Sequence, residues 1–464
     1  MSTTATLPDS AVRELRSSFQ GELVTPEDRS YDETRTIYNA MIDRRPGAIA
    51  QPADADGVAA AVRFAARHEV RVAVRGGGHS GAGLGLVDDG LVIDLSGLKS
   101  IEIDESAGTV RVGGGSTWGE VDRATNERGL ATVSGIISTT GVGGLTLGGG
   151  HGYLTRKYGL TIDNLLSAEV VLASGERVTA SGDENPDLFW AIRGGGGNFG
   201  AVTSFVFRLH PVANIVGGPV MWPIESTREV MQWYREFIPS APRELNMWLG
   251  LHTVPPAPMF PEELHFRKVA FAVVCYAGSP AEAEEALAPV RELGPPLLYG
   301  VQEMPYPTLQ AAFDDFYHPG LQWYWRHDFV GELPDEAIER HAEFGERLPT
   351  LHSTMHLYPV DGAVHDIGPD ETAFRFRNAQ WSQVIVGVDP DPAKADEIRS
   401  FAVDYWEAMH PYSLGGGYVN MMMEEGQERV RASYGENYDR LAAVKAVVDP
   451  GNRFSSTHNI TPKA

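Results

Sequence analysis

The sequence has 464 residues, of which 42% are hydrophobic and 22% charged, and this composition is ordinary for a globular enzyme of two or three domains. A formal net charge of −24 argues against a large basic surface, and therefore against nucleic acid as a partner. The single cysteine, Cys275, excludes internal disulfides and cysteine-based metal sites. Because we find neither a run of about 18 apolar residues nor a secretory signal pattern, we expect a cytoplasmic protein without a membrane span.

The first half of the sequence predicts short strands that alternate with helices. A strand over 46–51, a helix over 54–67 capped by Asp54, and a strand over 70–74 form a βαβ-like unit. A second helix is expected from a cap at Ser116 to about residue 128. Further elements follow from the same patterns: strands over 91–95, 101–103, 109–112, 165–172, 177–180 and 202–210, and a helix over 186–192.

After about residue 212 the composition changes, because proline and aromatic residues become frequent and glycine becomes rare. Amphipathic helices over 280–293 and 334–348, with strands over 268–276 and 380–388, predict a second α+β domain. A closing helix is expected over 434–447. We therefore divide the chain into a first domain over 1–211, a second domain over 212–414 and a return to the first domain over 415–464.

Glycine is the unusual residue, with 51 copies, or about 11% against an average of about 7%. Glycine lets the backbone approach a ligand closely or adopt a positive φ. The clustering predicts one glycine-rich ligand site, assembled mainly by the first half of the chain with a contribution from near its end. The clusters are Arg75–Gly85, Gly113–Gly115, Gly135–Gly152, Gly194–Gly200 and Gly415–Gly417.

Two glycine patterns match the dinucleotide fingerprint G-x-G-x-x-G, one beginning at Gly76 and one at Gly195. That fingerprint needs a helix to open at its third glycine, so that the helix N-terminus holds a pyrophosphate. Here a broken loop follows the first match and a strand follows the second, so both fail the test of context. The loop Arg75–Ser80 instead offers successive backbone N–H groups, which suit an anion such as a pyrophosphate.

Four segments in order, RVAVRGGGHS, GVGGLTLGGGHGYLTRKYGLTIDN, NPDLFWAIRGGGGNFG and NYDRLAAVKAVVDPGNRF, resemble the FAD-linked oxidases of the vanillyl-alcohol-oxidase type. The resemblance is greatest to the berberine-bridge-enzyme-like branch and covers roughly 30–212 and 415–462. It implies an α+β fold with a discontinuous FAD domain and a substrate domain built on an antiparallel sheet.

The resemblance also implies covalent FAD, attached through the histidine of RGGGH, which is His79. Relatives with a second, cysteinyl bond carry a cysteine where this chain has Ile137, so this chain resembles the singly attached, bacterial members. The cofactor-binding residues implied in this way are Arg75, Gly76, Gly77, Gly78, His79, Ser80, Gly83, Gly135, Ile137, Thr139, Thr140, Gly143, Gly144, Gly148, Gly149, Gly150, Gly152, Val202, Tyr418, Asn420 and Asn459.

Two residues are implied to handle the substrate proton. Tyr418 matches the tyrosine that lies beside the flavin in this family, but a phenol with a pKa near 10 is a poor base and needs a partner. By position that partner is His356, where relatives often carry a carboxylate; the alternative is a strand histidine that only fills the pocket. We do not expect a metal site with His352, because residues four apart on a strand lie about 13 Å apart.

The resemblance therefore implies an FAD-dependent oxidase. It would transfer a hydride from a small organic substrate, such as a secondary metabolite, an alcohol or an amine, to flavin N5, and O₂ would be reduced to H₂O₂. The alternatives are a flavin dehydrogenase with another electron acceptor, a carbohydrate oxidase, or a flavin-binding protein without activity. The aromatic runs 316–318 and 323–327 would line the substrate pocket or pack as ordinary core.

Overall fold

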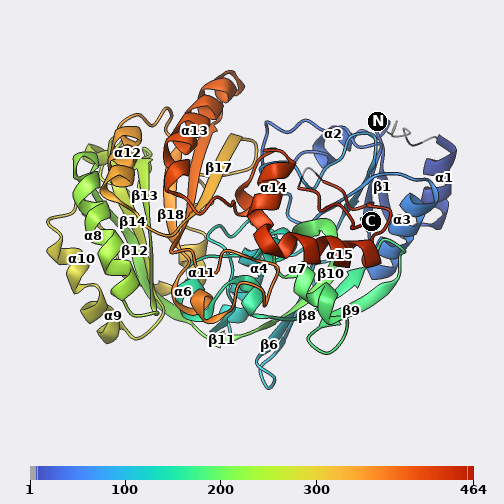
Figure 1. The fold of residues 1–464 in the computed structure, drawn as a ribbon, viewed down its shortest axis with the longest axis horizontal. Helices are drawn as coiled ribbons and strands as arrows, with labels where there is room; N and C mark the ends of the chain where they lie inside the picture. Colours follow the sequence, from blue (N-terminus) through green and yellow to red (C-terminus); the bar gives the residue numbers. More distant parts are fainter. Residues whose placement is uncertain (1–6, 8, 457) are drawn as a thin grey trace.

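The computed structural model describes residue 7, residues 9–456 and residues 458–464. The N-terminal segment considered above for a secretory signal therefore lies partly outside the described residues. Figure 1 shows the two halves of the molecule side by side, with the elements of 214–409 at one end and α1 (Asp9–Ser18), α3 (Ala55–Arg67) and β1 (Gly21–Val24) at the other. The architecture is the α+β arrangement expected from the sequence.

A four-stranded sheet forms the start of the chain, in the order β1, β2 (Ala48–Pro52), β4 (Leu91–Asp94), β3 (Val72–Arg75). β2 and β3 both run parallel to β4, and α3 makes the crossover between them. As the sequence predicts, Asp54 caps α3, and its carboxylate accepts a hydrogen bond of 2.9 Å from the Gly57 N–H. β3 ends at Arg75, where the first glycine loop begins.

A five-stranded antiparallel sheet follows, in the order β5, β6, β10, β8, β9. α4 (Trp118–Asn126) precedes its later strands, and its N-cap is Thr117 rather than the predicted Ser116. The reason is Glu120, which accepts a bond of 2.8 Å from the Thr117 N–H and so closes the first turn one residue later. The strands are β5 (Ile101–Asp104), β6 (Thr109–Gly113), β8 (Leu165–Val171), β9 (Arg177–Ser181) and β10 (Ala201–Arg208).

An eight-stranded antiparallel sheet dominates the other half, in the order β15, β12, β14, β13, β18, β19, β17, with β16 paired to β12. Helices α8 (Thr227–Ser240), α12 (Asp335–Gly345) and α13 (Ala395–Met409) cover one face. The strands are β12 (Asn214–Pro223), β13 (Leu245–Thr253), β14 (Lys268–Tyr276), β15 (Leu298–Tyr299), β16 (Gln302–Pro305), β17 (Gln322–Val330), β18 (Thr354–Pro359) and β19 (Trp381–Asp389).

Alternation along these strands separates the two faces of the sheet, since successive strand residues point to opposite sides. On β13, Met247, Leu249 and Leu251 pack against the helices, whereas Trp248 packs on the opposite side. β18 repeats the pattern, because Met355 and Leu357 face the helices. The face opposite the helices is therefore the one that meets the glycine-rich half of the molecule.

Two predicted helices are broken in the structure. The helix expected over 280–293 is split into α9 (Pro280–Ala286) and α10 (Ala288–Glu292), because Pro289 has no N–H and cannot continue the ladder of helix hydrogen bonds. The closing helix expected over 434–447 is interrupted near its start at Gly435, where φ is 51°: Tyr434 ends α14 (Gln427–Tyr434), and α15 (Tyr438–Val448) forms the rest.

The C-terminal helices return to the first half of the chain. α15 packs against α7 (Pro186–Ile192), and Tyr434 donates a hydrogen bond of 3.1 Å to the Gly195 carbonyl. The buried Lys445 ammonium donates to the carbonyls of Asn198 and Phe454. These bonds fix the end of the chain beside the glycine loops.

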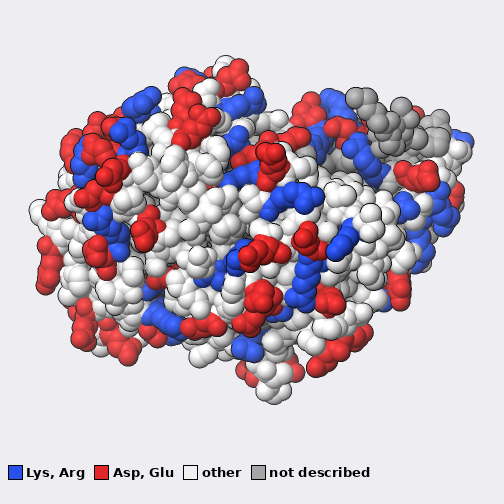
Figure 2. Space-filling view, viewed as in Figure 1, with Lys and Arg blue, Asp and Glu red and all other residues white. Residues whose placement is uncertain are grey.

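The remaining elements are short. None of the helices in the described residues has the length and apolar character that crossing a bilayer requires. On the face drawn in Figure 2, Lys and Arg side chains are interspersed with Asp and Glu. The short elements are α2 (Tyr31–Thr34), β7 (Leu130–Ala131), α5 (Val142–Gly148), α6 (Thr155–Tyr158), β11 (His210–Pro211) and α11 (Tyr306–Gln310).

Candidate active site

A cavity of about 320 Å³ lies between the glycine loops and the open face of the eight-stranded sheet. Its volume lies within the range of small-molecule sites in proteins, so it is a place for a ligand. Its lining has two ends. One, the glycine end, is made of backbone from loops at 76–80, 135–144 and 196–200; the other, the aromatic end, is made of side chains from the sheet.

The glycine end is closely packed where its loops meet. Gly77 and Gly141 touch backbone to backbone, and a Cβ built on Gly77 would lie 2.6 Å from the Gly141 Cα. Gly78 has a φ of 67°, which favours glycine. Glycine at these positions keeps the loops together and leaves their backbone at the cavity wall.

Gly144 and Gly197 test whether this end fits a cofactor. Both line the cavity, neither has a positive φ, and a Cβ built on either would meet no protein atom within 4 Å. Neither backbone conformation nor protein packing requires glycine there. Open space against bare backbone is what a large flat ligand such as FAD would fill, so the residues present fit the cofactor.

His79 lines the same end and is held in place by two contacts. Its Nε2 lies 2.9 Å from the Thr139 hydroxyl, and its ring stacks on Tyr38 with 3.7 Å between centroids. Burial lowers the pKa of His79 to about 3, so its imidazole is neutral at physiological pH. A neutral imidazole keeps one ring nitrogen with a free lone pair, which covalent attachment requires.

Arg75 lies at the cavity wall, but its guanidinium is engaged within the protein. It donates to the Asp94 carboxylate at 2.7 Å and to the Thr34 carbonyl at 2.6 Å, and both charged groups are buried. Desolvation raises the pKa of Asp94, but the bonds from Arg75 outweigh it and leave that pKa below its ordinary value. Arg75 therefore fixes the base of the loop, and the pyrophosphate expected there is left to the backbone N–H groups that follow.

The structure brings most of the predicted cofactor residues to the cavity, but not all. Gly148 meets the Asn420 side chain and Gly152 meets the Gly135 carbonyl, so these glycines serve packing within the protein. The predicted residues outside the lining are Gly83, Thr139, Gly148, Gly149, Gly150, Gly152 and Asn459. Lining residues that we did not single out include Gly114, Gly196, Gly197, Asn198, Tyr434, Ser456 and His458, of which the glycines belong to clusters visible in the sequence.

The aromatic end consists of rings from four strands and one loop. Trp323 and Trp325 from the predicted aromatic run 323–327 line it, and so does Tyr317 from the predicted run 316–318. Arg75 is the only lining residue with a charged side chain among the described residues, and its charge is paired with Asp94. The rings that enclose this end are Trp248, Phe271, Phe313, Tyr317, Trp323, Trp325 and Tyr358.

Tyr418 lies where the two ends meet. Its hydroxyl oxygen accepts hydrogen bonds from the Gly150 N–H and from the Asn420 side-chain amide, each 2.8 Å long. Its own N–H donates to His327 Nδ1 at 2.9 Å. Burial raises the pKa of Tyr418 to about 12 although both hydrogen bonds oppose the rise, so the phenol is protonated at neutral pH.

His356 also lines the cavity, but its hydrogen-bond partner is not Tyr418. Its Nδ1 lies 2.5 Å from the Tyr358 hydroxyl, and its ring lies 4.5 Å from that of Trp248. Burial holds the pKa of His356 well below its usual range. The pairing of Tyr418 with His356 that the sequence suggested is therefore not a direct hydrogen bond.

His151, which sequence reasoning missed, lies between the two. Its ring is 5.0 Å from that of Tyr418 and 5.2 Å from that of Tyr358, and it lines the cavity. One indication of its role was present in the sequence, because His151 is the only titratable side chain in the glycine-rich run 141–152. No group of three or more His, Cys, Asp or Glu within the described ranges is arranged to hold a metal ion.

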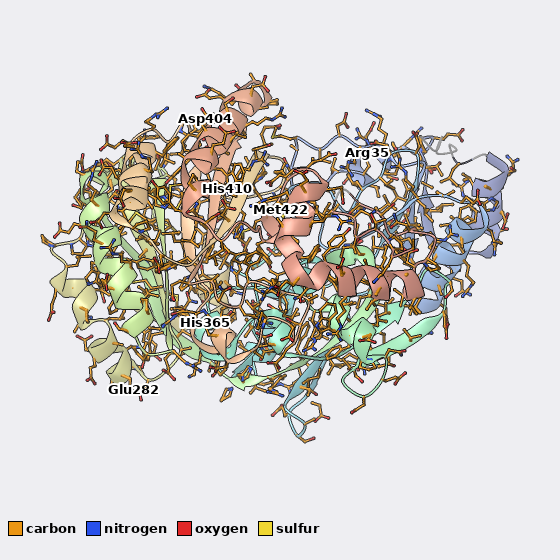
Figure 3. The ribbon with its side chains drawn as sticks, viewed as in Figure 1. Arg35, Glu282, His365, Asp404, His410 and Met422 are labelled. Carbon is orange, nitrogen blue, oxygen red and sulfur yellow. The ribbon has the colours of Figure 1, made fainter. Side chains whose placement is uncertain are left out.

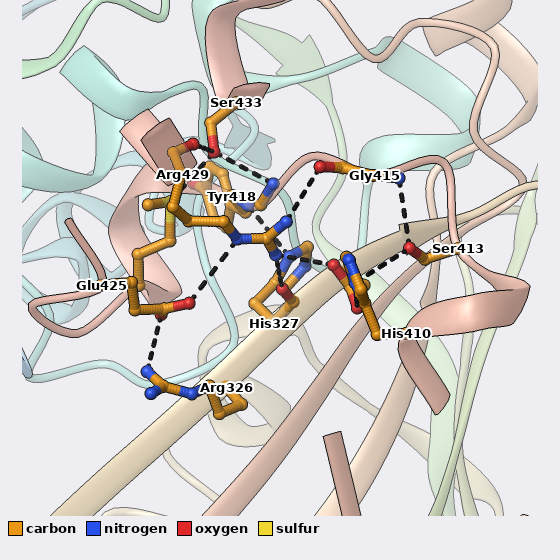
Figure 4. Close-up of polar contacts among 12 residues, drawn as sticks. Arg326, His327, His410, Ser413, Gly415, Tyr418, Glu425, Arg429 and Ser433 are labelled. Atoms are coloured by element: carbon orange, nitrogen blue, oxygen red, sulfur yellow. Dashed lines mark hydrogen bonds and ion pairs between the residues drawn. The ribbon is translucent and has the colours of Figure 1, made fainter. Parts of the chain in front are cut away.

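A buried ionic cluster fixes the segment that carries Tyr418 (Figure 4). Arg429 donates to the Asp328 carboxylate at 2.6 Å and to the Gly415 carbonyl at 2.9 Å. Glu425 contacts Arg326 at 3.1 Å, and His410 contacts Asp328 at 2.9 Å. His410 and Met422 are labelled near the middle of the molecule in Figure 3, where the chain crosses back towards its first half.

Comparison with known proteins gives two matches to family models. Residues 46–181 match the FAD binding domain, and residues 417–461 match the berberine and berberine-like family. The first contains the loops at 76–80 and 135–144, with His79, and the second contains Tyr418. Both segments line the glycine end of the cavity.

Relatives match along nearly the whole chain. An FAD-linked oxidoreductase of Dictyostelium discoideum is 30% identical over 97% of this chain and 97% of its own length. (R)-6-hydroxynicotine oxidase of Paenarthrobacter nicotinovorans is 31% identical over 96% of this chain and 98% of its own.

Solved structures show the same fold. 6-Hydroxy-D-nicotine oxidase from Arthrobacter nicotinovorans superposes with a TM-score of 0.86 and 28% identity, covering 96% of this chain and 99% of that one. Xylooligosaccharide oxidase from Myceliophthora thermophila, solved with xylobiose, has a TM-score of 0.85 and 25% identity, covering 99% and 100%.

Proposed function

This chain belongs to the berberine-bridge-enzyme-like family of FAD-linked oxidoreductases, and we propose that it is an oxidase that takes a hydride from a small organic substrate and passes the electrons to O₂, giving H₂O₂. The observation that carries the proposal is one cavity of about 320 Å³, with bare backbone at one end and aromatic rings at the other. A flavin would lie against the backbone, and a substrate would lie between the flavin and the rings. FAD, when bound, supplies the oxidising power, since it accepts two electrons with a hydride.

The division of the chain follows the same cavity. Residues 1–211 and 415–464 would hold FAD, because they provide the glycine end and Tyr418. Residues 212–414 would hold the substrate, because they provide nearly all the rings of the aromatic end.

His79 would attach FAD through one covalent bond. Support comes from its place in the glycine end, from its neutral imidazole, and from Ile137, a residue that cannot form a second link. Acid-precipitated protein should keep its yellow colour in the pellet, and His79→Ala should release the flavin into the supernatant. Colour that stays with the denatured variant would show that another residue carries the bond.

Tyr418 and His356 would move the substrate proton. Because its pKa is raised, the Tyr418 phenol keeps its proton and would donate a hydrogen bond to the reacting group. The His356 imidazole is neutral, so one of its nitrogens has a lone pair that would accept a proton. Between them lie His151 and Tyr358, which place all four polar side chains around one part of the cavity.

Oxygen consumption separates the oxidase from the dehydrogenase. A panel of aromatic alcohols, amines and sugars should first be screened under anaerobic conditions for compounds that bleach the flavin. Admission of air should then restore the colour within the turnover time and yield one H₂O₂ per substrate oxidised. Bleaching that air does not reverse, but an artificial electron acceptor does, would identify a dehydrogenase. Bleaching by sugars alone would favour a carbohydrate oxidase such as the similar xylooligosaccharide oxidase.

A further inference from the structure

A backbone N–H fixes the position of the hydrogen on His151. The Tyr418 N–H donates to His327 Nδ1, so the neutral His327 must carry its hydrogen on Nε2. That Nε2–H points to the Ser382 hydroxyl oxygen at 2.6 Å, and the Ser382 O–H is left to donate to His151 Nε2 at 3.0 Å. Because His151 Nε2 accepts, the hydrogen of the neutral His151 lies on Nδ1.

This Nδ1–H has no hydrogen-bond partner among the described residues, although the His151 side chain is buried. A buried donor without a partner costs about 1–3 kcal/mol, so such a group is expected to meet an acceptor on a ligand. The pKa of His151 is lowered by burial to about 4, and the donor is therefore uncharged.

Tyr418 offers a second donor beside it. The Gly150 N–H can only donate, and the Asn420 amide is oriented by the Leu145 carbonyl, which takes a hydrogen bond of 3.0 Å from the same Nδ2. Both partners of the Tyr418 oxygen are therefore donors, and the hydrogen of the phenol is directed to neither. The Tyr418 and His151 rings lie 5.0 Å apart and both line the cavity.

The charge of the surroundings limits what these donors can bind. No Asp, Glu or Lys lines the cavity within the described part of the chain, and the guanidinium of Arg75 is paired with Asp94. The other lining histidines are His79, His252, His356 and His458, and burial lowers the pKa of each. An ammonium group has no lone pair for the two donors and would find no carboxylate, and a carboxylate would find no free cation.

We propose that His151 Nδ1–H and Tyr418 Oη–H together bind one oxygen atom of an uncharged aromatic alcohol, the oxygen on the carbon that is oxidised. The proposal rests on the oxidase function above and names its substrate class. In the reaction the C–H bond of that carbon breaks and its electron pair leaves as hydride to FAD, the O–H proton passes to His356, and a C=O bond forms. The two donors stabilise the negative charge that develops on the oxygen as its proton leaves.

The test uses binding, so that it is independent of turnover. The FAD-loaded protein is titrated with acetophenone, which carries the carbonyl oxygen of the product, and with α-methylstyrene, which has the same shape but a CH₂ group in place of oxygen. Binding is followed by tryptophan fluorescence and by the flavin absorption spectrum. We expect acetophenone to bind about tenfold more tightly, as one or two net hydrogen bonds allow. Benzylammonium and benzoate should bind more weakly than either.

Two variants of His151 separate the donor from the ring. In His151→Asn the amide N–H₂ takes the place of Nδ1–H, and the preference for acetophenone should survive. In His151→Gln the amide reaches towards Ser382 instead, and the preference should fall about threefold or more. Tyr418→Phe should reduce it similarly, and the double variant His151→Gln with Tyr418→Phe should abolish it.

Several results would overturn the proposal. Equal affinities for acetophenone and α-methylstyrene in the unaltered protein would exclude a donor site for a substrate oxygen. If His151→Gln shifted the flavin spectrum or released FAD but left the preference unchanged, the acceptor would be a flavin carbonyl instead. Tight binding of benzylammonium would show that the site takes cations. If acetophenone binds selectively while no alcohol bleaches the flavin, the binding site stands and the oxidase function fails.

Discussion

The two ends of the cavity are built from different parts of the polypeptide. The glycine end is made of backbone, and its shape depends on side chains being absent at positions such as Gly77 and Gly141. The aromatic end is made of side chains that alternate residues of neighbouring strands carry to one face of a sheet, Trp248 and His356 among them. A cofactor common to a family can be held by backbone, whereas a substrate particular to one member must be recognised by side chains. Substitutions should therefore disrupt the glycine end by adding side-chain atoms and the aromatic end by removing them.

Removing one hydroxyl where the two ends meet should have the largest effect. Tyr418→Phe deletes the phenol oxygen that two donors orient, and a group taking part in proton transfer contributes about 10²–10⁴-fold. We expect the rate of flavin reduction by substrate, measured in a stopped-flow instrument without O₂, to fall by that factor. Tyr153→Phe is the matched control, since Tyr153 is buried but does not line the cavity. An unchanged rate in Tyr418→Phe would remove this residue from the reaction.

His356→Ala tests whether the second polar side chain acts in the same step. The rate of flavin reduction should also fall in His356→Ala. In the double variant Tyr418→Phe with His356→Ala, the increase in activation free energy should be less than the sum of the two single increases, because coupled residues share one interaction. The structure places no direct hydrogen bond between the two, so any coupling must pass through the substrate or through Tyr358 and His151. Strict additivity would indicate that His356 only shapes the pocket.

The connection between the two halves should be the next most sensitive feature. Arg156 on α6 and Asp361, which follows β18, form a buried ion pair at 2.7 Å. Asp361→Ala leaves the guanidinium buried without its counterion, and we expect a loss of about 3–5 kcal/mol in the free energy of unfolding. Asp366→Ala, which breaks an exposed pair with Arg243, should cost less than about 1 kcal/mol. Urea denaturation of both variants measures the difference, and equal losses would contradict it.

A buried carboxyl at the junction should make stability depend on pH. Asp122 accepts a hydrogen bond of 2.9 Å from Gln310 on α11, and it also faces Ser134, Tyr306 and the charge of Arg123. Burial raises the pKa of Asp122 to about 7, while its unfolded pKa is about 3.9.

A raised folded pKa means that the contribution of this carboxyl is fully present below about pH 4 and is lost as the pH rises towards 7. The loss should be about 1.4 kcal/mol per pH unit in that window. Asp122→Asn, which resembles the protonated acid, should match the unaltered protein at pH 4 and be more stable at pH 8. Parallel stability curves for the two proteins would show that Asp122 does not titrate there.

Adding one methyl group at the glycine end should have the smallest effect on stability but a clear effect on the cofactor. In Gly77→Ala the new Cβ would lie 2.6 Å from Gly141 backbone atoms, and overpacking of this kind costs about 1–3 kcal/mol. We expect reduced FAD content, measured as the ratio of flavin to protein absorbance. Gly182→Ala, where a Cβ meets nothing within 4 Å, should leave that ratio unchanged. Full FAD content in Gly77→Ala would show that the loops are able to separate.

The sequence alone determined the α+β fold, the cofactor and both bounds of several elements, including the helix Pro186–Ile192 and the strand Lys268–Tyr276. It could do so because periodicity, caps and runs of glycine encode backbone conformation locally, within a few neighbouring residues. It also located Tyr418 and the glycine loops, because family motifs are contiguous in the chain.

Only the tertiary structure decided which polar groups meet. Arg75 turns from the ligand to Asp94, His356 pairs with Tyr358 rather than Tyr418, and His151 acquires its hydrogen position through Ser382, 231 residues away. These partners depend on the order of strands in the sheets and on how the two halves meet. No local spacing records that information, because a hydrogen bond is satisfied by whichever group the fold brings within about 3 Å.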